Sequence, residues 1–172
     1  MRRFAILLLA AMAGSAAPVI ARPAAPAQTA APYTFEEVMV PMRDGTRLQT
    51  VILRPTGKAD KLPILLQRTP YGVPDAPPPS IPNNWRFLAE DGYILVFQNM
   101  RGQFKSEGEF TMSMALAPAG SKDVDEATDA YDTIDWLVKN VTGNNGKVGM
   151  WGVSYPGYAA AVALARPHPA AA

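Results

Sequence analysis

The sequence contains no cysteine and a single histidine among its 172 residues. Without cysteine there is no disulfide framework, no thiolate metal site and no cysteine nucleophile. One histidine leaves almost no material for a zinc site. We therefore expect neither a metal nor a cofactor.

An excess of charge of either sign is also missing, because 16 Lys and Arg residues balance 15 Asp and Glu residues, for a net charge of +1. Nucleic-acid-binding domains usually carry a basic patch or stripe, which this balance does not require. We therefore expect no nucleic-acid partner. The length and the 48% hydrophobic content are those of one ordinary globular domain.

No hydrophobic run is long enough to span a bilayer, and the one at residues 4–13 has about half the required length. Two arginines precede it, and a stretch of small residues typical of a cleavage site ends at Ala21. Residues 1–21 are predicted to be a signal peptide for the periplasm or secretion, and a retained membrane anchor is the disfavoured alternative. Residues 22–34, rich in Ala and Pro, are predicted to be a tether, and residues 35–172 the folded domain.

Strand patterns dominate the first half of the folded part. A turn signal at residues 43–45 separates two alternating segments, 37–41 and 47–54, which predicts an antiparallel hairpin. Nearly continuous apolar runs at 62–67 and 93–97 predict buried strands.

Helix and loop patterns fill the spaces between the strands. Apolar residues recur at three- and four-residue steps over 123–139, which predicts an amphipathic helix. The remaining expectations are a loop at 73–82, a short helix at 84–90, a loop at 103–120, a strand at 147–153 and an Ala-rich helix at 155–166. This alternation predicts an α/β fold in which antiparallel opening strands lead into a mostly parallel sheet with flanking helices.

Ser154 lies where the predicted strand 147–153 ends and the predicted helix 155–166 begins. A sharp turn at such a point lifts a serine hydroxyl above the carboxyl edge of the sheet, where it can act as a nucleophile toward acyl groups if a base is near. Gly152 keeps the turn free of a Cβ, and Pro156 falls in the first helical turn, where its missing N–H costs nothing. The alternative is a small serine in an ordinary strand-to-helix connection.

Several segments resemble one family of serine hydrolases. GVSYPG, at residues 152–157, matches the G-x-S-Y-x-G turn of a family that includes X-prolyl dipeptidyl-peptidases, cocaine esterase and other CocE/NonD hydrolases. The likeness runs from about Val38 to Pro169 and includes VPMRDGTRLQT, PILLQRTPYG, NMRGQFKSEGEF and DAYDTIDWLVKN. It is greatest to the α-amino-acid ester hydrolases, and it implies the N-terminal portion of an α/β-hydrolase fold. Two positions depart from the pattern, Asn99 and Pro156.

The resemblance also implies the site and the activity. Ser154 would be the nucleophile, the Tyr71 hydroxyl a donor to the oxyanion, and the Tyr155 backbone N–H the second donor. The implied reaction is cleavage of a small ester or amide through an acyl-enzyme, with X-Pro dipeptide cleavage as the alternative. A turn tyrosine packed on Pro70 is the alternative for Tyr71. A homo-oligomer of the full-length protein remains open.

The base that a serine nucleophile needs is not evident in this sequence. His168 follows Ser154 by 14 residues, about 21 Å along a helix, so we expect it to cap the last helical carbonyls instead. The resemblance places the catalytic Asp and His after residue 172. We therefore expect an incomplete domain that is inactive alone, with a non-catalytic fragment or interaction module as the alternative.

Other charged residues are expected to be structural. Asp129, Asp132 and Asp135 recur every three residues on one side of the predicted helix, which favours a solvated or loop-pinning face. Arg68 and Arg101 each lie beside a turn and are expected to form structural ion pairs.

Overall fold

The computed structural model describes residues 33–58, 61–76, 86–118 and 120–172. The predicted signal peptide, most of the predicted tether and residues 77–85 of the proline-rich segment lie outside the described residues. The first strand begins at Tyr33, whose side chain is 3% exposed. This strand therefore includes the last two residues of the predicted tether, and Tyr33 packs into the core.

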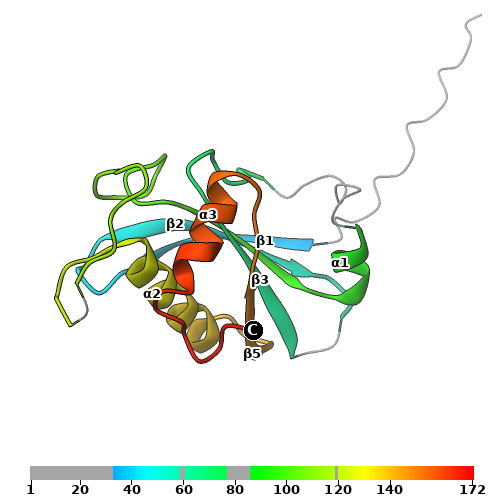
Figure 1. Cartoon of the computed structure of the whole chain (residues 1–172). Coiled ribbons are helices and arrows are strands. Elements are labelled where there is room, and N and C mark those ends of the chain that lie inside the picture. The colour runs from blue at the N-terminus through cyan, green and yellow to red at the C-terminus, as the bar shows by residue number, and fades with distance from the viewer. Residues whose placement is uncertain (1–32, 59–60, 77–85, 119) are drawn as a thin grey trace, which may run out of the picture.

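The described residues form five strands and three helices (Figure 1). In chain order they are β1 (Tyr33–Pro41), β2 (Arg47–Pro55), β3 (Leu62–Thr69), α1 (Arg86–Asp91), β4 (Ile94–Asn99), α2 (Glu126–Asn140), β5 (Asn144–Met150) and α3 (Tyr155–Ala163).

The strands form one sheet in the order β1-β2-β4-β3-β5. The first two pairings, β1 with β2 and β2 with β4, are antiparallel, whereas β3 is parallel to both β4 and β5. The predicted α/β fold, with antiparallel opening strands and a parallel continuation, is confirmed. Because β3 and β5 are parallel neighbours, the segments that follow them leave the sheet at the same edge.

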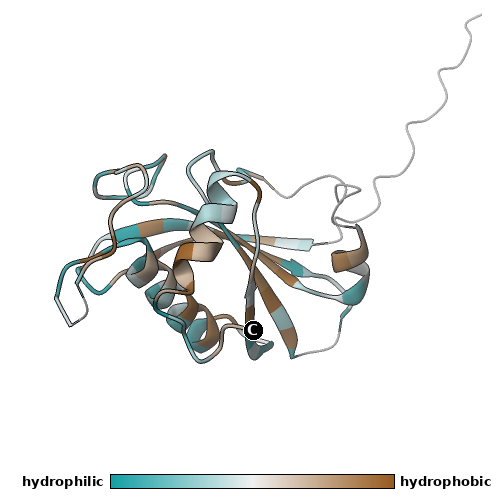
Figure 2. Cartoon of the chain, viewed as in Figure 1, coloured by the Kyte–Doolittle hydropathy of each residue, from teal (hydrophilic) through white to brown (hydrophobic). Residues whose placement is uncertain are grey.

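Side chains alternate between the two faces of the sheet, as they must in strands. One face carries Ile64, Leu66 and Val96, which pack against Ile134 and Leu137 of α2. Figure 2 shows hydrophobic segments along these strands, and β4 is buried along its whole length. The opposite face holds a second cluster made of Tyr33, Val51, Leu53, Leu95 and Phe97.

Helix and strand boundaries differ from the expected ones for local reasons. α2 begins at Glu126 because Asp125 is its N-cap and exchanges hydrogen bonds with Thr128 in a capping box. β5 covers Asn144–Met150 and so starts inside the segment that was expected to separate it from α2. α3 ends at Ala163, three residues early, and the chain returns until Ala171 forms a parallel bridge with Val148.

No helix in the described part of the chain is both long enough and apolar enough to cross a membrane.

Candidate active site

Ser154 occupies the turn between β5 and α3, in a backbone conformation that residues with a Cβ rarely adopt. Its φ is 62° and its ψ is −130°, outside the three main allowed regions for L-residues. The residue is exposed, and although it is the N-cap of α3 its hydroxyl makes no capping hydrogen bond. The turn therefore presents a hydroxyl to solvent at the carboxyl edge of the sheet, as the sequence predicts.

Two glycines make this turn possible. A Cβ on Gly152 would lie 2.6 Å from the Gly157 nitrogen and still closer to two atoms of Pro156, one of them in its backbone. A Cβ on Gly157 would in turn lie 3.0 Å from the Gly152 carbonyl oxygen. The end of β5 and the first turn of α3 are thus in direct backbone contact, which fixes Ser154 between them.

Tyr71 lies in the turn after β3, at the same edge of the sheet as Ser154. Its backbone N–H donates to the Thr69 hydroxyl at 3.0 Å, while its side chain is 64% exposed. The next residue, Gly72, has a φ of 103°, and a Cβ there would lie 3.1 Å from the ring of Phe104. The structure therefore places two exposed aromatic side chains, Tyr71 and Phe104, on neighbouring loops.

Tyr155 begins α3 and contributes two different groups. Its backbone N–H belongs to the first helical turn, where no helical carbonyl is available to accept it. Its hydroxyl accepts a hydrogen bond from the Ser113 backbone N–H at 2.8 Å, and its ring packs 5.9 Å from Phe110 and 5.2 Å from Tyr158, measured between centroids. This side-chain role was missed from the sequence, because the 103–120 segment has no periodicity that indicates where it folds back.

Buried arginines tie α2 to the sheet beneath this edge. Arg68, fully buried, donates to the Glu126 carboxylate at 2.9 Å and lies 3.7 Å from Asp129. Arg101 bonds Asp129 and Asp44, each at 2.7 Å. Burial opposes the charge of Arg101, but its bonds to Asp129 and Asp44 outweigh that effect and raise its pKa. The expectation of structural ion pairs for both arginines is confirmed.

The three aspartates of α2 do not share one environment. Asp129 is 2% exposed and so does not lie on a solvated face; it is the counter-ion of Arg68 and of Arg101, which lies in the loop after β4. Asp132 pins the hairpin turn through a two-pronged bond to Arg43, with contacts of 2.7 and 2.9 Å. Asp135 pairs with Lys139 one turn along the helix. Asp129 and Asp132 thus each bind an arginine of a loop, in agreement with the loop-pinning expectation.

His168 does not cap α3, contrary to expectation. Its Nδ1 accepts a hydrogen bond from the Ala170 backbone N–H at 3.0 Å, and its Nε2 lies 3.5 Å from an Asp135 oxygen. Its ring meets Tyr131 edge-on. Because α3 separates Ser154 from His168 along the chain and His168 faces α2, the structure does not bring the two together.

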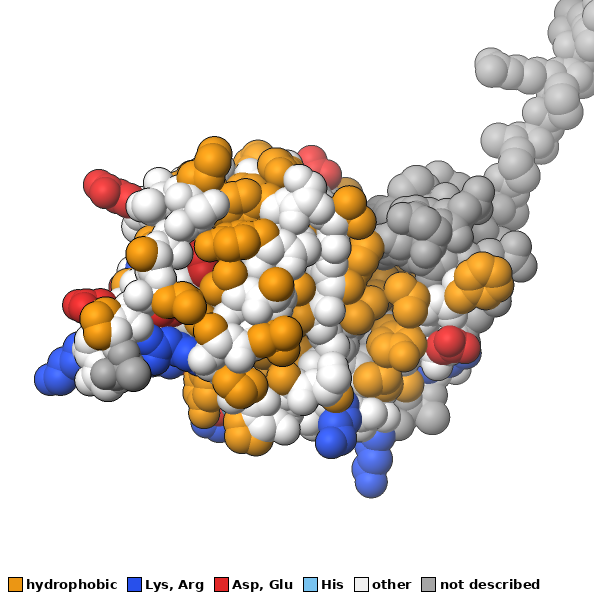
Figure 3. Space-filling view, viewed as in Figure 1, with side chains coloured by type: hydrophobic (Ala, Val, Ile, Leu, Met, Phe, Trp, Pro, Cys, Tyr) orange, Lys and Arg blue, Asp and Glu red, His pale blue; other side chains and the backbone are white. Residues whose placement is uncertain are grey.

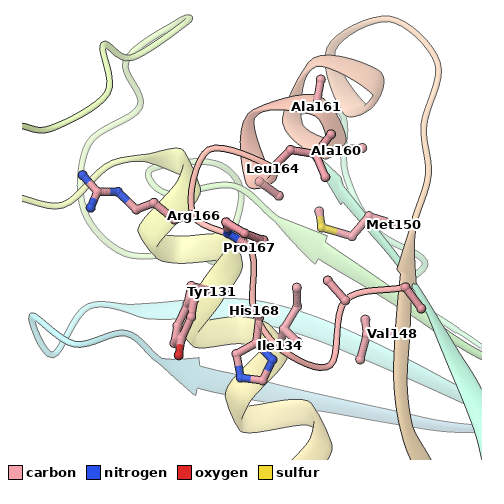
Figure 4. A pocket seen from close by; sticks show the side chains of 13 residues that line it. Tyr131, Ile134, Val148, Met150, Ala160, Ala161, Leu164, Arg166, Pro167 and His168 are labelled. Atoms are coloured by element: carbon pink, nitrogen blue, oxygen red, sulfur yellow. The ribbon is translucent and has the colours of Figure 1, made fainter. Parts of the chain in front are cut away.

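A cavity of about 280 Å³ opens between β5, α2, the far half of α3 and the last residues of the chain (Figure 4). The residues that line it, labelled in Figure 4, include Tyr131, Ile134, Met150, Leu164 and His168. None of the three predicted site residues lines it. The cavity therefore belongs to the packing of the C-terminal segment and not to the Ser154 turn.

Exposed apolar side chains occur in each of the three loops that leave the carboxyl edge. They are Tyr71 in the loop after β3, Phe104 and Met112 in the loop after β4, and Val153 beside Ser154, all between 64% and 79% exposed. Figure 3 shows hydrophobic side chains spread over the side of the molecule that carries α3. No group of three or more His, Asp or Glu side chains suited to a metal ion occurs in the described segments.

The chain is similar to several known hydrolases. The model of the X-Pro dipeptidyl-peptidase (S15 family) matches residues 44–172. Cocaine esterase of Rhodococcus sp. (strain MB1 Bresler) is 42% identical over 121 residues. Among solved structures, an α-amino acid ester hydrolase is 46% identical with a TM-score of 0.75, and an aminopeptidase of a Thaumarchaeota archaeon is 38% identical with the same TM-score.

The matches cover most of this chain but a small part of each relative. They span 70% of this chain and 19% of cocaine esterase, 90% and 26% for the α-amino acid ester hydrolase, and 91% and 27% for the aminopeptidase. The resemblance stated from the sequence is confirmed, as is the relationship to ester hydrolases and peptidases. The chain belongs to the X-Pro dipeptidyl-peptidase (S15) family of hydrolases.

Proposed function

We propose that Ser154 is the nucleophile of a serine hydrolase that cleaves acyl esters or amides through an acyl-enzyme. The observation that carries this proposal is the conformation of Ser154: a positive φ, an exposed side chain and a hydroxyl that does not cap the helix it precedes. A structural serine at a helix N-terminus would use its hydroxyl as a cap. Strain of this kind is concentrated at functional sites, where the surrounding packing maintains it.

The reaction follows from the groups around this turn. The Ser154 Oγ attacks the substrate carbonyl carbon and gives its proton to a base, while the carbonyl oxygen becomes an oxyanion. The Tyr71 hydroxyl and the Tyr155 backbone N–H are the proposed donors to that oxyanion. The base then protonates the departing alcohol or amine, and a water molecule, deprotonated by the same base, releases the acid from Ser154.

The base is proposed to come from polypeptide outside these 172 residues. His168 is the single histidine of the sequence, and it is held between the Ala170 N–H and Asp135 on α2. Cocaine esterase and the α-amino acid ester hydrolase are both several times longer than the matched region. On this proposal the 172 residues alone bind substrate poorly and do not turn it over.

For the substrate, we propose an ester or amide of an α-amino acid. Support comes from the 46% identity to an α-amino acid ester hydrolase over 90% of this chain. The family name and the 38% identity to an aminopeptidase favour the alternative, a peptide with an X-Pro terminus. The two substrate classes differ in their leaving group and in the residue whose carbonyl carbon is attacked.

The experiment uses the product of the encoding gene, expressed from its start codon to its stop codon, which we call the full gene product. It is assayed with p-nitrophenyl acetate, phenylglycine methyl ester and an X-Pro p-nitroanilide. Ser154→Ala should lower kcat on the preferred substrate by about 10⁴-fold or more, and Tyr71→Phe by about 10²-fold.

Ser121→Ala is the matched control, because Ser121 is another exposed serine whose hydroxyl accepts a local turn hydrogen bond. It should leave all three rates unchanged. Full activity of Ser154→Ala would overturn the proposed mechanism. A Ser154-dependent reaction with the anilide alone would transfer the substrate assignment to the X-Pro alternative.

A further inference from the structure

Ser113 lies in the long loop between β4 and α2 and is hydrogen-bonded to Tyr155, the first residue of α3. Its φ of 51° is in the left-handed region, which residues with a Cβ rarely adopt. Its backbone N–H donates to the Tyr155 hydroxyl at 2.8 Å. The Tyr155 phenol thus holds one strained residue, and we call this hydrogen bond the Ser113 clamp.

The same loop is fastened to α3 at two further points. Phe110 packs against the Tyr155 ring, three residues before Ser113. Beyond the C-terminal end of α3, Arg166 donates to the Ala117 carbonyl at 2.7 Å and pairs with Asp125 at 3.4 Å. The loop therefore runs along α3 from its first turn to beyond its last, and its position near Ser154 is set by the clamp.

Met112 is the most exposed of the large apolar side chains in this loop, ahead of Phe104 and Leu116. Met112, the residue before Ser113, is 73% exposed, and Val153, the residue before Ser154, is 79% exposed. The hydrogen bond from the Ser113 N–H to the Tyr155 hydroxyl brings the Met112 backbone toward the start of that helix. A flexible thioether side chain with no partner at such a place can fold over an apolar ligand.

We propose that the Ser113 clamp holds Met112 as a wall of the acyl-binding site, so that Met112 sets the preference for larger apolar acyl groups and Tyr155 positions it through its hydroxyl. This rests on the proposed role of Ser154. Tyr155 thus acts twice: its backbone N–H faces the oxyanion, and its side chain holds the loop that contacts the acyl chain.

The first experiment tests the clamp without any need for activity. In the full gene product, Tyr155→Phe removes the acceptor for the Ser113 N–H, and chymotrypsin should then cut after Phe110 about fivefold faster, the effect of losing one hydrogen bond. Tyr131→Phe removes a hydroxyl on α2 and is the matched control. An unchanged rate after Tyr155→Phe would overturn the clamp.

The second experiment tests the acyl preference in the full gene product. Met112→Ala should lower kcat/KM for p-nitrophenyl octanoate relative to p-nitrophenyl acetate by at least about fourfold, the loss for one methylene group released from contact, mainly through KM. Leu164→Ala is the control, since Leu164 is also 73% exposed but lies at the other end of α3. An unchanged octanoate-to-acetate ratio would overturn the role of Met112.

These experiments distinguish a failure of the proposed nucleophile from a failure of the inference about Met112. If Ser154→Ala retains activity, the proposed nucleophile is wrong, yet faster cleavage after Phe110 in Tyr155→Phe would still establish the clamp. If Ser154→Ala is inactive while Met112→Ala keeps the wild-type preference, the nucleophile stands and the inference about Met112 fails.

Discussion

Replacing Gly152 with alanine tests whether the close approach of β5 and α3 fixes the Ser154 turn. The new Cβ would lie 2.6 Å from the Gly157 nitrogen and nearer still to Pro156. Backbone atoms cannot rotate away, so the first turn of α3 must shift. Gly149→Ala is the matched control three residues earlier, in β5, because its Cβ would meet a Leu65 methyl at 3.4 Å, an ordinary contact.

The size of the effect follows from these contacts. Overpacking costs typically 1–3 kcal/mol, and a clash with backbone lies at the upper end, so Gly152→Ala should lower the free energy of unfolding by about 3 kcal/mol. Gly149→Ala should change it by less than about 1 kcal/mol. Urea unfolding of the 172-residue chain measures both differences, provided the m-value is unchanged. The corresponding Tm shift for Gly152→Ala is about 6–12 °C.

A second readout connects this clash to the site. In the full gene product at low temperature, where folded enzyme remains, Gly152→Ala should also reduce kcat, because the shifted turn moves Ser154. Equal stability of the Gly152 and Gly149 variants, or normal kcat of Gly152→Ala, would refute the reasoning that the glycine contact holds the nucleophile.

Three further predictions concern the supports of the site. Arg68→Met should lower the free energy of unfolding by about 3–5 kcal/mol, because it leaves the buried Glu126 carboxylate without its partner; chemical denaturation measures this, and a loss below 1 kcal/mol would contradict it. Thr69→Val removes the acceptor of the Tyr71 N–H and should reduce kcat, while Thr69→Ser restores it; an inactive Thr69→Ser would point to packing instead. Burial opposes the charge of Asp125, but bonds from backbone N–H groups and nearby Arg166 outweigh it and hold the Asp125 pKa below its ordinary 3.8. A carboxyl whose pKa is lower in the folded chain stabilises it above the unfolded value, so stability should fall as pH drops below about 4, with a smaller fall in Asp125→Asn; identical acid denaturation of both chains would refute this.

The fold was largely predictable because each element has a local signature. The buried runs at 62–67 and 93–97 became β3 and β4, and the turn at residues 43–45 became the bend between β1 and β2. Boundaries were less predictable, since they depend on tertiary partners. Asn144 starts β5 because β3 lies beside it, and no local pattern in the sequence indicates that pairing.

The turn at Ser154 was predictable for a different reason. Glycines two residues before and three residues after a serine at a strand-to-helix junction are typical of a tight turn, and the structure has such a turn at Ser154. The buried position of Asp129 was not predictable, because its counter-ions come from distant parts of the chain, Arg68 from β3 and Arg101 from the loop after β4. The Ser113 clamp likewise joins residues 42 positions apart in a loop without periodicity.

Covalent labelling of the full gene product with a fluorophosphonate tests the central claim most directly. The account predicts one phosphonate adduct, mapped to Ser154 by peptide mass spectrometry, that disappears in Ser154→Ala and forms normally in Ser121→Ala. An adduct on another residue, or hydrolysis that continues at full rate after Ser154 is labelled, would contradict the account.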